Sequence, residues 1–281
     1  MTKLLTDMHT HSTFSHDGRS SLLEMIDRAR EQGLCFYGVS EHLDYDLFFS
    51  TFNEKYKGYE PEEYFHKARH LQEDYQGVIN VLIGYEFGYI DDEKIKKMYQ
   101  DVVEKYAPDF VINSIHLCNG EDYYFKNVYY KEKNGEKALR NKDEVYEEYL
   151  SAVRRSLDVN YHYDIVGHLG YATRYAPYED KRIDVEKHKA LLVDILQTII
   201  KKDKILEVNS SNKGGLGEFL PQRDIIELYF ALGGRQISYG SDAHDVGRVA
   251  DKRAEVMQTL KEIGFTYVVV PCKKEYIKIE I

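Results

Sequence analysis

Cysteine is scarce in this chain of 281 residues, and tryptophan is absent. The three cysteines, Cys35, Cys118 and Cys272, lie far apart and form no C-x-x-C pair, which argues against a disulfide framework and against a structural zinc site built on thiolates. Free thiols are typical of a reducing compartment. We therefore expect a cytoplasmic protein.

Long apolar runs and an excess of positive charge are lacking as well. No segment approaches the roughly 20 apolar residues of a membrane helix, and the first residues lack the apolar stretch of a signal peptide. The formal net charge is −10, whereas nucleic-acid-binding proteins normally carry a basic face. We therefore expect neither a membrane nor a nucleic acid as partner, and an anionic substrate would depend on local cations.

What the chain does contain is a repeated alternation of short apolar runs with longer amphipathic segments. This alternation indicates repeated βα units around a parallel sheet. The predicted strands are 3–9, 35–40, 80–85, 110–115, 165–168, 204–209 and 236–240, and the predicted helices are 20–32, 61–75, 93–106, 143–157, 185–202, 221–232 and 250–263. One or two further strands are expected within 266–281. Because no repeat or linker interrupts the pattern, we expect residues 1–281 to form one α/β domain.

A longer and more charged stretch, around residues 119–142, separates the fourth predicted strand from the next helix. It carries the aromatic residues Tyr123, Tyr124, Phe125, Tyr129 and Tyr130. Long loops on such scaffolds often shape access to the site. The sequence leaves open whether this loop insertion is a lid or a solvated loop.

Residues that bind metal ions stand at the ends of six of the apolar runs. His9 and His11 are two residues apart, so that on a strand both imidazoles face the same side. In a parallel barrel the carboxyl ends of the strands surround one site. The candidates are His9, His11, His16, Asp17, His42, Glu86, His116, His168, Asp242 and His244. Mixed imidazole and carboxylate ligands suit zinc, manganese or iron, and the set is too large for one ion, so we expect several ions that share carboxylates.

The order of these motifs resembles that of the PHP (polymerase and histidinol phosphatase) family of metal-dependent phosphoesterases. The matching segments are His9-Thr10-His11, Ser40-Glu41-His42, Tyr85-Glu86, Ser114-Ile115-His116, Gly167-His168 and Ser241-Asp242-Ala243-His244. Within the family the chain most resembles the stand-alone histidinol-phosphate phosphatases, in the segment Phe14-Ser15-His16-Asp17-Gly18, in its length and in the helical region 64–75. The resemblance implies a distorted (β/α)7 TIM-like barrel, the PHP fold, with three divalent metal ions.

The resemblance also implies which residues hold each ion. The first set is His9, His11, Glu86 and Asp242, the second is Glu86, His116 and His168, and the third is Asp17, His42 and His244. We assign Asp17 rather than its neighbour His16 as a ligand because Asp17 lies six residues beyond His11, as the family pattern has it. His16 is left as a contact to the substrate or to a ligand.

The activity that the resemblance implies is hydrolysis of L-histidinol phosphate to L-histidinol and phosphate in histidine biosynthesis. Clustered metal ions lower the pKa of a bridging water and neutralise phosphoryl oxygens, so that a metal-bridging hydroxide would attack phosphorus. Glu86 would bridge ions, and His244 or His16 would protonate the leaving oxygen. Arginine matches phosphate well, and the candidates for binding this small phosphorylated amino alcohol are Arg174, Arg19 and Lys213.

Other activities remain open from the residues alone. A PHP-type phosphatase or phosphodiesterase acting on phosphotyrosine or a nucleotide would use the same ligands. An amidohydrolase barrel also begins with an H-x-H pair, but its bridging carboxylated lysine has no counterpart at the end of a predicted strand here. The sequence decides neither the metal nor whether the protein is a monomer or a homo-oligomer.

Overall fold

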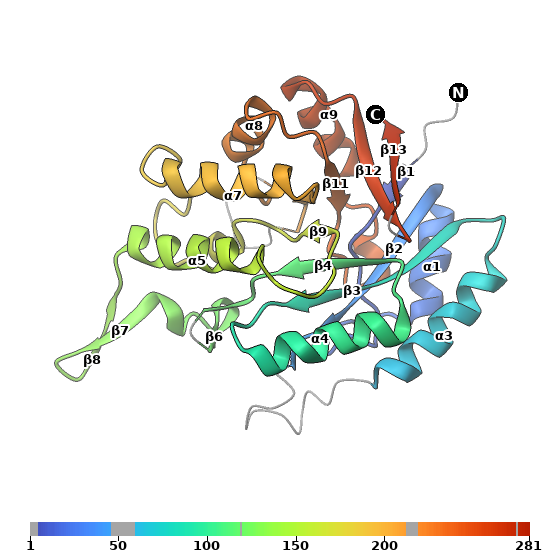
Figure 1. The fold of residues 1–281 in the computed structure, drawn as a ribbon, viewed down its shortest axis with the longest axis horizontal. Coiled ribbons are helices and arrows are strands. Elements are labelled where there is room, and N and C mark those ends of the chain that lie inside the picture. The colour runs from blue at the N-terminus through green and yellow to red at the C-terminus, as the bar shows by residue number, and fades with distance from the viewer. Residues whose placement is uncertain (1–4, 46–59, 119, 212–218, 274) are drawn as a thin grey trace.

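A seven-stranded parallel sheet forms the centre of the protein, as Figure 1 shows. The structure is a computed structural model that describes residues 5–45, 60–118, 120–211, 219–273 and 275–281. In spatial order the strands are β1 (Leu5–Asp7), β2 (Leu34–Leu43), β3 (Asn80–Gly88), β4 (Phe110–Ser114), β9 (Ile165–Val166), β10 (Ile205–Asn209) and β11 (Ile237–Gly240). All seven predicted strands are confirmed, and residues 3 and 4 of the first lie outside the described residues.

The sheet curls into a nearly closed barrel because the segments that follow β1 and β11 meet. Met8 N donates to Tyr239 O at 3.0 Å, and His11 N donates to Ala243 O at 2.8 Å. The strands are buried on both faces, as parallel strands covered by helices usually are, and every residue of β3 after Asn80 is buried. The predicted distorted (β/α)7 barrel with a single domain is therefore confirmed.

Helices surround the barrel strands (Figure 1). They are α1 (Leu22–Glu31), α3 (Pro61–Asp74), α4 (Glu93–Tyr106), α5 (Lys142–Ser156), α7 (Lys189–Lys201), α8 (Arg223–Ala231) and α9 (Arg253–Ile263). The start of α1 is fixed by a capping box between Ser21 and Glu24, which satisfies backbone N–H groups at both residues. The predicted α9 begins three residues late because Ala250 and Lys252 have positive φ angles of 60° and 54°, which a helix does not accept.

The predicted loop insertion has regular structure. After β5 (Leu117–Cys118) it contains β6 (Glu121–Asp122), the 3-10 turns η1 (Tyr123–Phe125) and η2 (Asn127–Tyr129), and the hairpin of β7 (Tyr130–Lys133) and β8 (Glu136–Leu139). Tyr123 and Tyr129 are buried, and the Tyr123 ring meets that of Tyr149 on α5 edge to face at 5.6 Å between centroids. These two tyrosines anchor the insertion, while the β7–β8 hairpin projects from the body (Figure 1).

A C-terminal strand pair, a short helix and the 3-10 turn η3 (Val246–Arg248) complete the described elements. The expected C-terminal strands are the antiparallel pair β12 (Tyr267–Cys272) and β13 (Glu275–Glu280). A short helix that the sequence did not predict, α6 (Tyr171–Arg174), follows β9 and carries two residues of importance for the site. None of the helices within the described ranges is both long and apolar enough to cross a membrane.

Candidate metal centre

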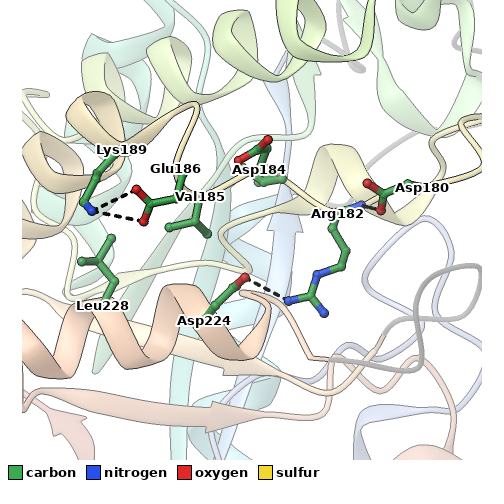
Figure 2. A pocket seen from close by; sticks show the side chains of 9 residues that line it. Asp180, Arg182, Asp184, Val185, Glu186, Lys189, Asp224 and Leu228 are labelled. Atoms are coloured by element: carbon green, nitrogen blue, oxygen red, sulfur yellow. Dashed lines mark hydrogen bonds and ion pairs between the residues drawn. The ribbon is translucent and has the colours of Figure 1, made fainter.

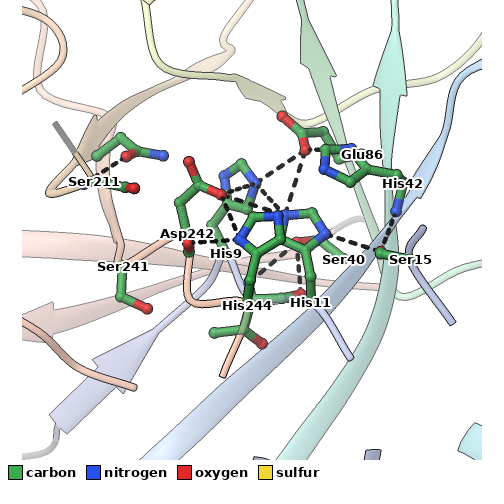
Figure 3. Close-up of polar contacts among 12 residues, drawn as sticks. His9, His11, Ser15, Ser40, His42, Glu86, Ser211, Ser241, Asp242 and His244 are labelled. Carbon is green, nitrogen blue, oxygen red and sulfur yellow. Dashed lines mark hydrogen bonds and ion pairs between the residues drawn. The ribbon is translucent and has the colours of Figure 1, made fainter. Parts of the chain in front are cut away.

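Glu86, which is buried at the carboxyl end of β3, contacts a group of histidines, several of which are labelled in Figure 3. Its Oε2 atom is 3.2 Å from His9 Nε2 and 3.4 Å from His11 Nε2. The same oxygen is 3.0 Å from Nδ1 of His42, which comes from the end of β2. One carboxylate oxygen thus faces three imidazole nitrogens from two strand ends.

The other oxygen of Glu86 faces a second pair of histidines. Glu86 Oε1 is 2.8 Å from His168 Nε2 and 3.2 Å from His116 Nε2, and the two Nε2 atoms are 3.3 Å apart. A carboxylate that divides its oxygens between two groups of imidazoles has the arrangement required to bridge two cations. Glu86 is therefore the geometric centre of the site.

Asp242, His244 and Asp17 extend the group towards the surface. Asp242 Oδ1 is 3.5 Å from His11 Nε2 and 3.5 Å from His244 Nδ1. Asp17, whose side chain is 47% exposed, approaches His244 Nε2 at 3.0 Å and His42 Nε2 at 3.7 Å. The structure thus brings all nine predicted ligands to one end of the barrel.

Three sets of these residues place one ligand atom each within 4.8 Å of one another. They are His9, His11 and Glu86; His42, Glu86 and His116; and His11, His42 and His244. His42 belongs to two sets because its Nδ1 faces Glu86 and its ring stacks on that of His11, 4.1 Å between centroids. The sets share members, as expected for ions held close together.

Hydrogen bonds behind the histidines determine which ring nitrogen holds the proton. His9 Nδ1 is 2.6 Å from Glu207 Oε1, and because an ionised carboxylate only accepts, Nδ1 of His9 donates. His116 Nδ1 faces Asp44 Oδ1 at 3.3 Å in the same way. When His9 and His116 are neutral, their Nε2 atoms, which face Glu86, therefore carry a lone pair and no proton.

The tautomer of His11 follows from Ser15. Ser15 Oγ donates to Glu41 Oε2 at 2.5 Å and accepts the backbone N–H of His42 at 2.9 Å. His11 Nδ1, 3.1 Å from the same hydroxyl, must therefore donate to it, which leaves a lone pair on His11 Nε2. Burial and the charges of His42 and His244 lower the pKa of His11 well below its ordinary value, so its ring is neutral.

This arrangement fits bound cations. His9 Nε2 and His11 Nε2 are 3.0 Å apart, and both face Glu86 Oε2. When the two rings are neutral, all three atoms are acceptors, and a positive ion between them stabilises the contact. Although burial opposes it, the charges of Glu207 and Glu86 raise the pKa of His9 well above its ordinary value. The carboxylates thus favour positive charge at this point, and the donor set suits a divalent metal.

Arg174 is the predicted substrate contact that the structure places nearest this group. Its buried guanidinium donates from Nη2 to Asp242 Oδ2 at 3.1 Å and to Asn209 Oδ1 at 3.3 Å. Its buried Nε has no hydrogen-bond partner among the described residues. The guanidinium also lies over the ring of Tyr171, 4.9 Å from the centroid.

The other residues predicted to contact the substrate either lie at the rim of the site or fall outside the described residues. His16 is exposed, and its ring is 5.4 Å from that of His42. Arg19 donates its backbone N–H to His244 O at 2.7 Å, but its side chain is exposed. Lys213 lies outside the described residues.

Two acidic residues of the site were missed from the sequence. Glu207 interrupts the apolar strand β10, where a single carboxylate among buried residues was an available signal. Asp44 lies two residues beyond His42, at the spacing that places both on one side of an extended chain. Glu207 contacts His9 and Asp44 contacts His116 on the ring nitrogen that faces away from Glu86. In the sequence, ligands were considered at the ends of the predicted strands, and both residues were therefore passed over.

A surface hollow of about 520 Å³ lies apart from this group, between α8 and the segment before α7 (Figure 2). Its two cationic side chains, Arg182 and Lys189, each pair with an acidic residue of the hollow. Arg182 contacts Asp224 at 2.9 Å, and Lys189 contacts Glu186 at 3.1 Å. None of the nine predicted ligands lines the hollow, so the chemistry lies at the barrel end.

Comparison with known proteins gives the same motifs a family context. The PHP domain profile matches residues 7–211. A probable histidinol-phosphatase of Clostridium acetobutylicum is 30% identical over 86% of this chain and 87% of that protein. The histidinol-phosphatase of Lactococcus lactis is 29% identical over 92% of this chain and 91% of that protein.

Solved structures agree with these sequence relationships. The crystal structure of histidinol phosphate phosphatase from Lactococcus lactis, in complex with zinc, L-histidinol and phosphate, matches with a TM-score of 0.82 at 26% identity, covering 98% of this chain and 99% of that one. A putative histidinol phosphatase from Listeria monocytogenes has the same fold, with a TM-score of 0.72 at 20% identity, over 89% of this chain and 99% of that one.

Proposed function

This chain belongs to the PHP-domain family, and on that premise we propose that it hydrolyses L-histidinol phosphate to L-histidinol and phosphate as a metal-dependent phosphomonoesterase. The observation that carries the proposal is likeness over nearly the full length to histidinol-phosphatases, one of them solved with L-histidinol and phosphate. The complete set of candidate ligands at the barrel end supports the same activity.

We propose that the site holds three divalent ions. The residues that would hold them are His9, His11, Glu86 and Asp242 for the first, Glu86, His116 and His168 for the second, and Asp17, His42 and His244 for the third. Zinc occurs in the Lactococcus lactis structure, and the donor atoms here also suit manganese and iron. When bound, such ions polarise phosphoryl oxygens and lower the pKa of a coordinated water towards neutrality.

Arg174 is the protein group best placed to bind the phosphate. Its guanidinium is held beside Asp242 by one nitrogen, which leaves the buried Nε–H available for a phosphoryl oxygen. Arginine offers several such donors in a fixed plane, and stacking on Tyr171 fixes that plane further. Arg174 therefore holds the phosphate in position next to the metal centre.

His16 is the better of the two candidates for donating a proton to the leaving oxygen. Both ring nitrogens of His244 face carboxylates, those of Asp17 and Asp242, and this occupies them. The ring of His16 lies at the rim, 5.4 Å from that of His42.

The substrate is a small phosphorylated amino alcohol, and we expect the enzyme in the cytoplasm, in keeping with its free cysteines. The test is a phosphate-release assay on purified protein loaded with manganese, zinc or iron. We expect kcat/KM for L-histidinol phosphate to exceed that for phosphotyrosine and nucleoside monophosphates by at least about 100-fold. Turnover of those esters without turnover of L-histidinol phosphate would overturn the proposal.

A further inference from the structure

A line of aromatic rings leads from the candidate metal centre to the surface of the insertion. The Tyr171 ring is 4.9 Å from the ring of His168, and Tyr175 follows at 5.6 Å. Tyr124 of the insertion lies 5.3 Å from Tyr175, and Phe125 lies 5.3 Å from Tyr124. The line therefore joins α6, which follows β9, to the insertion, which follows β4.

The outer end of this line is exposed to solvent. Tyr124 is 58% exposed and Phe125 is 48% exposed, whereas Tyr171 is buried. Large apolar rings that remain in water next to a binding site are typical of surfaces that contact a ligand. Aromatic faces bind planar rings and cations.

A carboxylate lies beside the same rings. In the β5–β6 pair, Asp122 is opposite Leu117, the residue after His116, and Tyr123 N donates to His116 O at 3.2 Å. Asp122 Oδ1 accepts the N–H of Tyr124 at 2.7 Å, so the carboxylate is held at the base of that residue. Asp122 thus lies between the centre and the exposed rings.

The Asp122 carboxylate is half-buried, and its charge environment supports a role in binding. Within the described ranges, no Lys, Arg or His side chain forms an ion pair with it, although it is half-buried. Burial raises the pKa of the Asp122 carboxyl, and the charges of His116 and His42 act on it in the opposite direction. A half-buried carboxylate with no cationic partner is suited to a cationic ligand.

These groups match the order of charges along the substrate. L-histidinol phosphate carries a phosphate at one end, an ammonium a few single bonds away, and an imidazole at the other end. Arg174 lies over the Tyr171 ring, at the inner end of the line of aromatic rings, while Asp122 and Tyr124 lie nearer its exposed end. A phosphate held at Arg174 would direct the rest of the molecule along the rings.

We propose that Asp122 and Tyr124 form a subsite for the amino-alcohol end of the substrate. The Asp122 carboxylate pairs with the ammonium, and the Tyr124 ring, supported by Tyr175, packs on the imidazole. This inference rests on the proposed function and deepens it, because it makes the insertion the element that distinguishes L-histidinol phosphate from other phosphate monoesters. The centre and Arg174 act on the phosphate, which all these esters share.

The test compares two substrates in two matched variants. Asp122→Asn removes the charge but keeps an oxygen that can accept the Tyr124 N–H, and Glu121→Gln makes the same change at an exposed neighbour on the opposite face of β6. In metal-loaded enzyme, we expect Asp122→Asn to raise KM for L-histidinol phosphate roughly 10- to 100-fold, the loss typical of a hydrogen bond to a charged group. We expect KM for p-nitrophenyl phosphate, which has no ammonium, to be unchanged, and Glu121→Gln to behave as wild type.

A second pair of variants and a binding measurement examine the ring. Tyr124→Ala should raise KM for L-histidinol phosphate and not for p-nitrophenyl phosphate, and Tyr124→Phe, which keeps the ring, should raise it less than Tyr124→Ala does. Calorimetric binding of L-histidinol should weaken in Asp122→Asn and in Tyr124→Ala. Equal effects of Asp122→Asn on both substrates, or no effect on either, would overturn the subsite while wild-type turnover of L-histidinol phosphate leaves the proposed function standing. Absence of that turnover in wild type would overturn both.

Discussion

Glu207 and His9 are joined by a contact of 2.6 Å between Oε1 and Nδ1, and both side chains are buried. The second oxygen of Glu207 accepts the backbone N–H of His168 at 2.6 Å. One carboxylate on β10 thus positions the residues that follow β1 and β9. Carboxylates in this position fix the ring orientation of a metal-binding histidine and raise its basicity.

We predict that Glu207→Gln lowers metal affinity or kcat/KM by about 10- to 100-fold, the usual effect of removing such a partner. A glutamine has one acceptor oxygen, so it cannot serve both His9 and His168. Metal titration by calorimetry measures the affinity, and circular dichroism verifies the fold. Asp109→Asn is the control, since Asp109 is a buried carboxylate bonded to Arg69 and should affect thermal stability without affecting metal affinity. Unchanged metal binding in Glu207→Gln would contradict the prediction.

Replacing Glu86 by glutamine should have a larger effect. The amide cannot carry the negative charge that Glu86 shares between His9 and His168, so we expect loss of bound metal and a fall in kcat/KM of more than about 100-fold. Elemental analysis of the purified variant gives the metal content. Full metal content together with full activity would show that Glu86 does not bridge ions.

Arg174→Lys should weaken binding of the phosphate itself. Lysine keeps the charge but loses the planar donors, so we expect KM to rise about 10-fold for L-histidinol phosphate and for p-nitrophenyl phosphate alike. Inhibition by inorganic phosphate should weaken by a similar factor. This pattern differs from that of Asp122→Asn, and unchanged phosphate inhibition would remove Arg174 from the site.

Removing metal should destabilise the folded protein. Without metal, His9 Nε2, His11 Nε2 and Glu86 Oε2 lie close together in a buried space with at most a proton among them. We expect chelation to lower Tm, since ligand at 100 times its Kd stabilises by about 2.7 kcal/mol, and zinc to restore it. Differential scanning calorimetry measures the shift, which should shrink in Glu86→Gln. A Tm insensitive to chelator and zinc would be the contrary result.

Alkaline pH should destabilise the fold through buried tyrosines such as Tyr149. Its hydroxyl accepts the N–H groups of Gly170 and Tyr171 at 2.8 and 3.0 Å, and burial raises the pKa of Tyr149 to about 12. The unfolded chain releases this proton near pH 10, so the stabilisation is complete below pH 10 and is lost towards pH 12, at about 1.4 kcal/mol per pH unit.

Urea unfolding between pH 9 and 11.5 measures this loss, and tyrosinate absorbance reports deprotonation. We expect the free energy of unfolding to fall above pH 10 and the absorbance of the buried tyrosines to rise together with unfolding. Tyr149→Phe should show a shallower fall. A free energy that stays constant over the range would contradict the assignment.

The barrel could be predicted from the sequence because its signals are local. Each strand is an apolar run of the right length, and the predicted ligands other than Asp17 stand at or just after the ends of such runs, as at Glu86 and His168. In a parallel barrel all carboxyl ends face the same way, so local signals were enough to group these residues, whereas Asp17 was assigned from the family resemblance.

Other features depend on which distant segments meet, and these were not predicted. Glu207 acts on His9 only because β10 and the end of β1 approach each other in the closed barrel. The contacts of both ring nitrogens of His42 with carboxylates follow from its position between Glu86 and Asp17. The ordered insertion depends on Tyr123 packing against α5, a contact that no sequence period encodes.

The seam at which the barrel closes has a consequence for biosynthesis. Thr10 and Ala243 form a parallel bridge there, with His9 and His11 on one side and Asp242 on the other. A growing chain leaves the ribosome with its histidines long before Asp242 emerges. Nascent chains therefore carry an incomplete set of the candidate ligands for most of translation, and the complete set can assemble only once the seam has closed.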